Sequence, residues 1–122
     1  MTARRFRALV AEVLDSLPRR FAEKLENVVV QVEEEPTAED LERAGVDPRR
    51  GTLFGLYDGV PLCERGDTAP VLPDRIVLFR KPLCRAFPDE AALRRQVRIT
   101  LLHEIAHHFG FDEQTLRDLG YG

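Results

Sequence analysis

The sequence feature that most constrains the fold of this chain is a long helical pattern close to its C-terminal end. Apolar side chains recur every four residues between positions 89 and 110, with polar residues between them. This spacing predicts an amphipathic helix that buries one face. The stripe consists of Leu93, Val97, Leu101, Ile105 and Phe109. Gly110 then stands where a helix C-cap is expected, because a residue with positive φ can turn the chain sharply there.

The length of 122 residues predicts one domain that spans positions 1–122. A chain of this size has one core of modest volume, so a functional site must be built from few elements. The sequence contains no apolar run of about 18 residues, which argues against a membrane span. Its charged N-terminal stretch does not resemble a secretory signal.

Cysteine content and charge narrow the class of protein further. Cys63 and Cys84 are the only cysteines, too few for a disulfide framework or a four-cysteine zinc site, and we interpret both as packing residues. Two free thiols without a leader predict a cytoplasmic protein. The chain has 18 basic and 21 acidic residues, for a net charge of −3, so we expect no nucleic-acid partner and no membrane partner. The oligomeric state is left open.

The remaining pattern predicts an α+β domain. Apolar residues at helical spacing predict a helix over 6–17, which Pro18 ends, and a short helix over 21–26. The valines of 28–32 predict a largely buried strand, and Thr37 with Asp40 predicts a capped helix that ends at Gly45. Further predicted segments are strands over 52–57 and 60–64 joined by a hairpin turn at Asp58-Gly59, a polar loop over 65–74, a strand over 76–79, a short connection between Pro82 and Pro88, and a last short helix. This order favours a small mixed or antiparallel sheet of three to four strands packed with helices.

All three histidines of the chain lie within six consecutive residues of the predicted long helix. His103 and His107 are four residues apart, so their imidazoles project from one face and can bind one divalent metal ion at about 2.0–2.1 Å each. Glu104 lies about 100° around the helix from His103, where it can reach a water bound to that metal. The pattern predicts a metal-dependent hydrolase in which Glu104 is the general base.

A third ligand is expected after the turn at Gly110. Glu113 and, as the alternative, Asp112 lie within reach of that turn. Each also has a structural interpretation, because Asp112 could cap a last helix and Glu113 could interact with the helix dipole. His108 faces away from the other two histidines, and it is interpreted either as a packing residue or as a donor to an oxyanion. Further candidates for that donor, none favoured over the others, are Tyr57, Tyr121 and Arg75.

At these residues the sequence resembles a known family. The pattern His103-Glu104-x-x-His107-x-x-Gly110-x-x-Glu113 resembles the extended zincin motif. The run His107-His108-Phe109-Gly110, the ending Leu119-Gly120-Tyr121, the phrase over 55–62 and the strand over 73–78 resemble the minimal zincins, small bacterial zincin-like metallopeptidases. The resemblance implies a mixed sheet over a C-terminal active-site helix, one Zn²⁺ per chain, Glu113 in the ligand position and peptidase activity. Met1 is the only methionine, so the Met-turn of the metzincins is absent.

Three functions are compatible with this pattern. The first is a zinc metallopeptidase, whose substrate would be a peptide or flexible protein segment lying beside a strand of the predicted hairpin. The second is a non-catalytic zinc-binding or interaction module, although a structural zinc site normally has four protein ligands and only three are evident here. The third is a metal-dependent RNase or RNA-maturation factor. A similar small RNase-like family has a third histidine and places glycine where this chain has Glu104, which counts against it.

Overall fold

The computed structural model describes residues 1–59, 74–110, 114 and 117 of the chain. In this part the helices are α1 (Ala3–Asp15), α2 (Arg19–Ala22), the 3-10 turn η1 (Glu23–Leu25), α3 (Ala38–Arg43), α4 (Arg80–Ala86) and α5 (Glu90–Phe109). The strands are β1 (Val28–Glu33), β2 (Gly55–Asp58) and β3 (Asp74–Phe79). None of the helices in the described ranges is long and apolar enough to cross a membrane.

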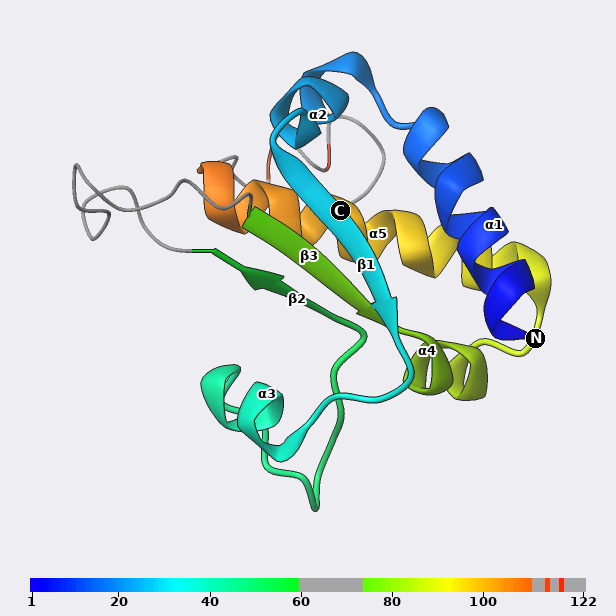
Figure 1. Cartoon of the computed structure of the whole chain (residues 1–122), viewed down its shortest axis with the longest axis vertical. Helices are drawn as coiled ribbons and strands as arrows, with labels where there is room; N and C mark the ends of the chain where they lie inside the picture. The colour runs from blue at the N-terminus through cyan, green and yellow to red at the C-terminus, as the bar shows by residue number, and fades with distance from the viewer. Residues whose placement is uncertain (60–73, 111–113, 115–116, 118–122) are drawn as a thin grey trace.

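The strands form a mixed sheet in the order β1-β3-β2. β1 is parallel to the central strand β3, with Val30 opposite Ile76, and β2 is antiparallel to it, with Tyr57 also opposite Ile76. Figure 1 shows α5 running behind this sheet and α1 beside it. The predicted α+β class with a small mixed sheet is therefore confirmed.

One apolar core joins the sheet to the helices. The predicted stripe of α5 supplies Leu93, Val97, Leu101 and Ile105, all buried, whereas Phe109 at its end is 37% exposed. Ile76 and Leu78 enter the core from β3. α1 contributes its predicted apolar face through Phe6, Leu9, Val10 and Val13. This burial fixes the rotation of α5, because its apolar stripe must face β3 and α1.

Three local predictions need correction. The valine run is an edge strand whose residues alternate, and Val29 is 41% exposed, because β1 turns only one face toward the core. The segment between Pro82 and Pro88 is mostly the helix α4. Pro82 is tolerated there because the third residue of a helix has no intrahelical acceptor for its N–H.

The predicted strand over 52–57 is also displaced, to Gly55–Asp58. The pairing between β2 and β3 ends at Phe79, the last residue of β3, whose N–H donates to the carbonyl of Phe54. The chain then enters α4 and leaves the sheet. The predicted partner strand 60–64 and the last short helix fall outside the described residues, as does Cys63. Cys84 is a free thiol that packs against the core, in line with its predicted role.

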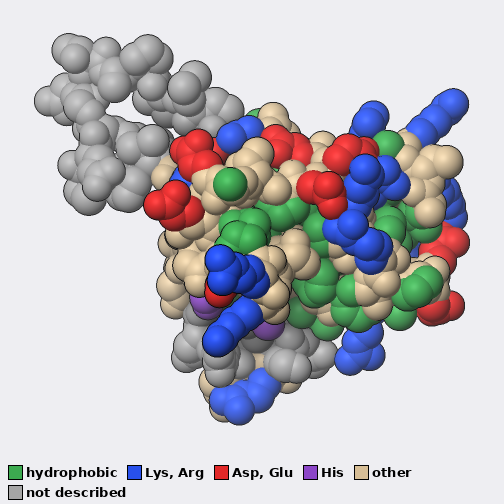
Figure 2. All heavy atoms as spheres, turned by 90° about the horizontal axis from the view of Figure 1, so that it is seen from below, with side chains coloured by type: hydrophobic (Ala, Val, Ile, Leu, Met, Phe, Trp, Pro, Cys, Tyr) green, Lys and Arg blue, Asp and Glu red, His purple; other side chains and the backbone are tan. Residues whose placement is uncertain are grey.

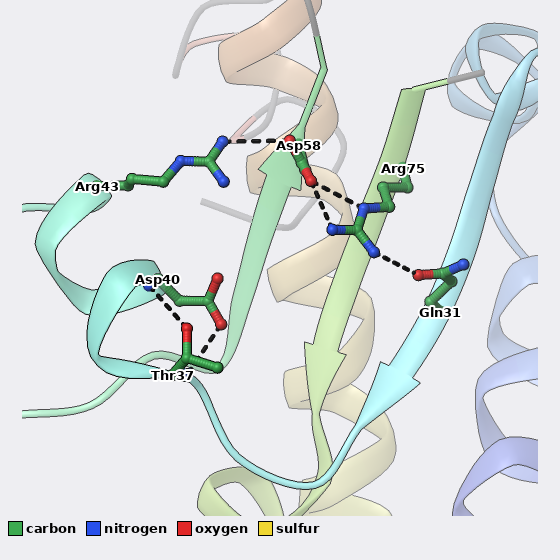
Figure 3. Close-up of polar contacts among 6 residues, drawn as sticks. All are labelled: Gln31, Thr37, Asp40, Arg43, Asp58 and Arg75. Carbon is green, nitrogen blue, oxygen red and sulfur yellow. Dashed lines mark hydrogen bonds and ion pairs between the residues drawn. The ribbon is translucent and has the colours of Figure 1, made fainter. Parts of the chain in front are cut away.

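A polar cluster ties the three strands together on the face of the sheet that points away from α5 (Figure 3). Arg75 donates to Asp58 of β2 at 2.8 Å and to Gln31 of β1 at 2.9 Å. Arg43 of α3 donates to the other Asp58 oxygen at 3.2 Å. The hydrogen bond from Arg75, supported by the one from Arg43, lowers the pKa of Asp58. The cluster holds the edge strand β2 to its neighbours from outside the core.

Candidate metal centre on the C-terminal helix

The helix α5 presents the predicted histidine pair to solvent. Asp89 caps its first turn by accepting from the N–H of Ala92 at 2.9 Å, and Gly110 ends it in the left-handed region at φ 77°. Both ends therefore lie where the sequence predicts them. His103 and His107 fall one turn apart within this helix, and both are exposed. Histidine side chains are visible at the surface in Figure 2.

This arrangement fits part of a zinc site. Two imidazoles at i and i+4 on a rigid helix are a common pair of zinc ligands, and their exposure leaves room for an ion between them. Within the described ranges, no three His, Cys, Asp or Glu side chains gather in a way that could hold a metal. The predicted third ligand, Glu113 or Asp112, falls outside those ranges, and so does Tyr121. The donor set thus supplies two ligands of the correct chemistry.

Glu104 occupies a different environment from the two histidines that flank it. It is half-buried between α5 and β2, and this burial raises the pKa of its carboxyl group. Three weaker influences oppose the rise: the charge of His107, a hydrogen bond from the backbone N–H of Tyr57, and the charge of His103. A carboxyl group with a raised pKa that still accepts a fixed hydrogen bond is suited to take up and release a proton.

β2 contacts α5 at two successive levels. At the first, Gly55 approaches Thr100 so closely that a Cβ on the glycine would lie 2.7 Å from the Thr100 Cγ2. At the second, two residues along the strand and one turn along the helix, Tyr57 donates to Glu104. The two spacings match, since two strand residues span about 6.8 Å and four helical residues about 6.0 Å. The close packing at Gly55 thereby sets the distance at which Tyr57 meets Glu104.

The side chain of Tyr57 continues these contacts toward the end of the helix. Its ring stacks on the His108 imidazole, with centroids 3.8 Å apart and planes inclined by 10°. Its hydroxyl donates to Asp74 Oδ2 at 2.9 Å, and His108 Nε2 lies 3.6 Å from the same oxygen. Phe109 meets both rings edge-on. His108 therefore packs against Tyr57, as its structural interpretation predicts, and its role as a donor to an oxyanion stays a prediction.

The structure thus brings together four of the predicted residues, His103, Glu104, His107 and His108, with Tyr57 beside them. It separates Arg75 from them, because that side chain lies in the cluster on the opposite face of the sheet (Figure 3).

Sequence reasoning missed Thr100 and Asp74. The only available signals were the position of Thr100 four residues before Glu104 and that of Asp74 at the end of the predicted polar loop, just before a predicted strand.

Comparison with known proteins assigns the chain to a family. The family model for zincin-like metallopeptidases matches residues 25–122, which is most of the chain. The chain belongs to the zincin-like metallopeptidase family. This confirms the resemblance drawn from the histidine motif, and enzymes of this family generally use zinc. No functionally curated protein matches the chain. The match begins at the η1 turn, so α1 and α2 lie outside it.

Proposed function

We propose that this zincin-like protein is a zinc-dependent peptidase in which Glu104 is the general base. The observation that carries the proposal is the placement of Glu104, half-buried beside the edge strand and flanked by two exposed histidines on the same helix. His103 and His107 would hold the zinc ion together with Glu113, or with Asp112 as the alternative third ligand. When bound, zinc would acidify a water molecule and polarise the carbonyl of the scissile peptide bond.

The chain's own residues supply the remaining steps. Glu104 accepts the proton of the attacking water and then delivers it to the leaving amine, and a carboxyl group is more efficient in both transfers when its pKa lies closer to the working pH. Burial of Glu104 raises its pKa in that direction. The hydrogen bond from the Tyr57 amide keeps the carboxylate oriented between those two transfers.

The edge strand β2 indicates what kind of substrate this site would accept. β2 pairs with β3 on one side only, among the strands described. An extended peptide can add to such an edge through main-chain hydrogen bonds, which depend on its extended backbone and not on the identity of its side chains. We therefore propose a peptide or flexible protein segment as the substrate.

The test compares wild type with Glu104→Gln and with His103→Ala on a degenerate peptide library, with zinc measured per chain by elemental analysis. Glu90→Gln is the matched control, since Glu90 lies at the other end of α5 in an exposed ion pair with Arg5. We expect Glu104→Gln to retain zinc and lose at least about a hundredfold in kcat, because general-base catalysis contributes about 10²–10⁴-fold.

Each variant also has an outcome that contradicts the proposal. Full zinc occupancy in the wild type without Glu104-dependent cleavage would refute the peptidase and favour a zinc-binding module. Zinc retained at wild-type affinity by His103→Ala would place the metal elsewhere.

A further inference from the structure

Tyr57 contacts α5 through both its backbone and its side chain. Its N–H donates to Glu104, and its ring stacks on His108, one helical turn further along. Its hydroxyl reaches back to Asp74 of the neighbouring strand β3. A single side chain thus links the end of the edge strand to the helix and to the central strand.

Asp74 is the hydrogen-bond partner of Tyr57 on the central strand β3. Its side chain is only 15% exposed, and the same oxygen, Oδ2, accepts from Tyr57 and lies near His108 Nε2. The chain leaves β2 directly over this pair, because a Cβ on Gly59 would lie 2.7 Å from Asp74 and 2.9 Å from the Tyr57 ring. Residues of β2, of α5 and of the segment just after β2 therefore pack closely around Asp74 and the Tyr57 ring.

We propose that Tyr57, His108 and Asp74 form a positioning cluster that holds the end of β2 against α5 and so fixes the orientation of the Glu104 carboxylate. The catalytic meaning of this cluster rests on the proposed function of Glu104. A glutamate side chain has several rotamers of similar energy, and its carboxylate keeps one orientation only if a partner of fixed position holds it. The Tyr57 amide is such a partner only while β2 stays in place.

An edge strand needs this support more than a central one. Among the described strands, β2 has a hydrogen-bonded neighbour on one side only, and local opening of a sheet begins at such elements. The cluster of Asp58, Arg75 and Arg43 on the opposite face also holds β2, through hydrogen bonds to β3 and α3. The Asp58 cluster therefore fixes β2 in the sheet, and the Tyr57 cluster fixes β2 to α5, the helix that carries Glu104.

The first measurement is hydrogen exchange of the backbone amides in the full chain, with NMR monitoring each amide. The variants Tyr57→Phe and Asp74→Ala remove the two ends of the hydroxyl contact. Asp58→Asn is the matched control, because it is isosteric, lies on the same strand and faces the opposite side. In the first two variants we expect the protection of the residue-57 amide to fall about tenfold relative to the other β2 and β3 amides, whereas in Asp58→Asn it should follow them.

The second measurement is peptide cleavage by the zinc-loaded protein. Tyr57→Phe is expected to lower kcat about tenfold while KM and zinc content stay at the wild-type values, and Glu90→Gln, at the far end of α5, should keep the wild-type kcat. Unchanged protection at residue 57, or an equal loss across both strands, would overturn the cluster. Changed protection with an unchanged kcat would overturn its role in positioning Glu104. A wild type that cleaves no peptide would refute the proposed function alone, since the exchange measurement still decides whether the cluster exists.

Discussion

The close approach of β2 to α5 at Gly55 gives a prediction that needs no assumption about activity. In Gly55→Ala the new methyl group would lie 2.7 Å from Thr100 Cγ2 and 3.2 Å from the carbonyl oxygen of Val77. An ordinary contact begins at 3.4 Å, so strand and helix would have to separate by about 0.7 Å at this point. Neither neighbour moves easily, because Thr100 is buried in the middle of α5 and the oxygen belongs to the backbone of β3.

The magnitude follows from two opposing terms. Overpacking of this kind costs about 1–3 kcal/mol, and the loss of a glycine from the unfolded chain returns about 0.4–1 kcal/mol. We expect Gly55→Ala to lower the free energy of unfolding by about 1–2 kcal/mol. Adding Thr100→Ala removes the nearest methyl group and should recover about 1 kcal/mol, a coupling within the range for residues in contact. Recovery stays partial because the contact with Val77 remains.

Urea unfolding of wild type, both single variants and the double variant measures this coupling. Gly51→Ala is the control, since a Cβ there would meet only a Val46 methyl group at an ordinary 3.7 Å. That substitution should be neutral or slightly stabilising. The reasoning fails if Gly55→Ala is as stable as Gly51→Ala, or if the effects of Gly55→Ala and Thr100→Ala simply add.

Three further predictions concern the core, a helix cap and a surface charge. Leu101→Ala should lower the free energy of unfolding by about 3 kcal/mol, because Leu101 is fully buried in α5, and a loss below about 1 kcal/mol in urea would contradict its place in the core. Thr37→Ala should cost about 1 kcal/mol in the same assay by breaking the capping box with Asp40, and no loss would mean that α3 does not depend on its cap. Asp58→Asn should be destabilising near neutral pH. Because Arg75 lowers the pKa of Asp58, the stability that this carboxylate contributes is present above its ordinary value of 3.8 and disappears as the pH falls through the lower folded value. Unfolding curves of wild type and variant should therefore converge in acid, and a difference that does not depend on pH would refute the ion pair.

Much of the site could be predicted from the sequence because it depends on local geometry. His103, Glu104 and His107 lie on one helix whose apolar stripe and C-terminal glycine can both be recognised from the sequence. Helical periodicity alone then decides that both imidazoles share a face. The α+β class followed from the same kind of local pattern.

The errors arose where local signals conflict with the tertiary structure. The proline at position 82 suggests a break, yet it lies in the first turn of α4, where a proline costs little. The valines of β1 suggest burial, yet Val29 is exposed, because β1 turns only one face toward the core, and which face a strand buries is decided by the elements packed against the sheet.

The sequence by itself determined the candidate site of this protein, since the histidine motif and the helix that carries it lie in one continuous stretch of residues. Only the tertiary structure decided the environment of that site. Tyr57 and Glu104 are separated by 47 positions in the chain, and nothing in the spacing predicts that the amide of one meets the carboxylate of the other. That contact depends on strand order, on the missing side chain at Gly55 and on the rotation of α5, which are set by packing across the whole core.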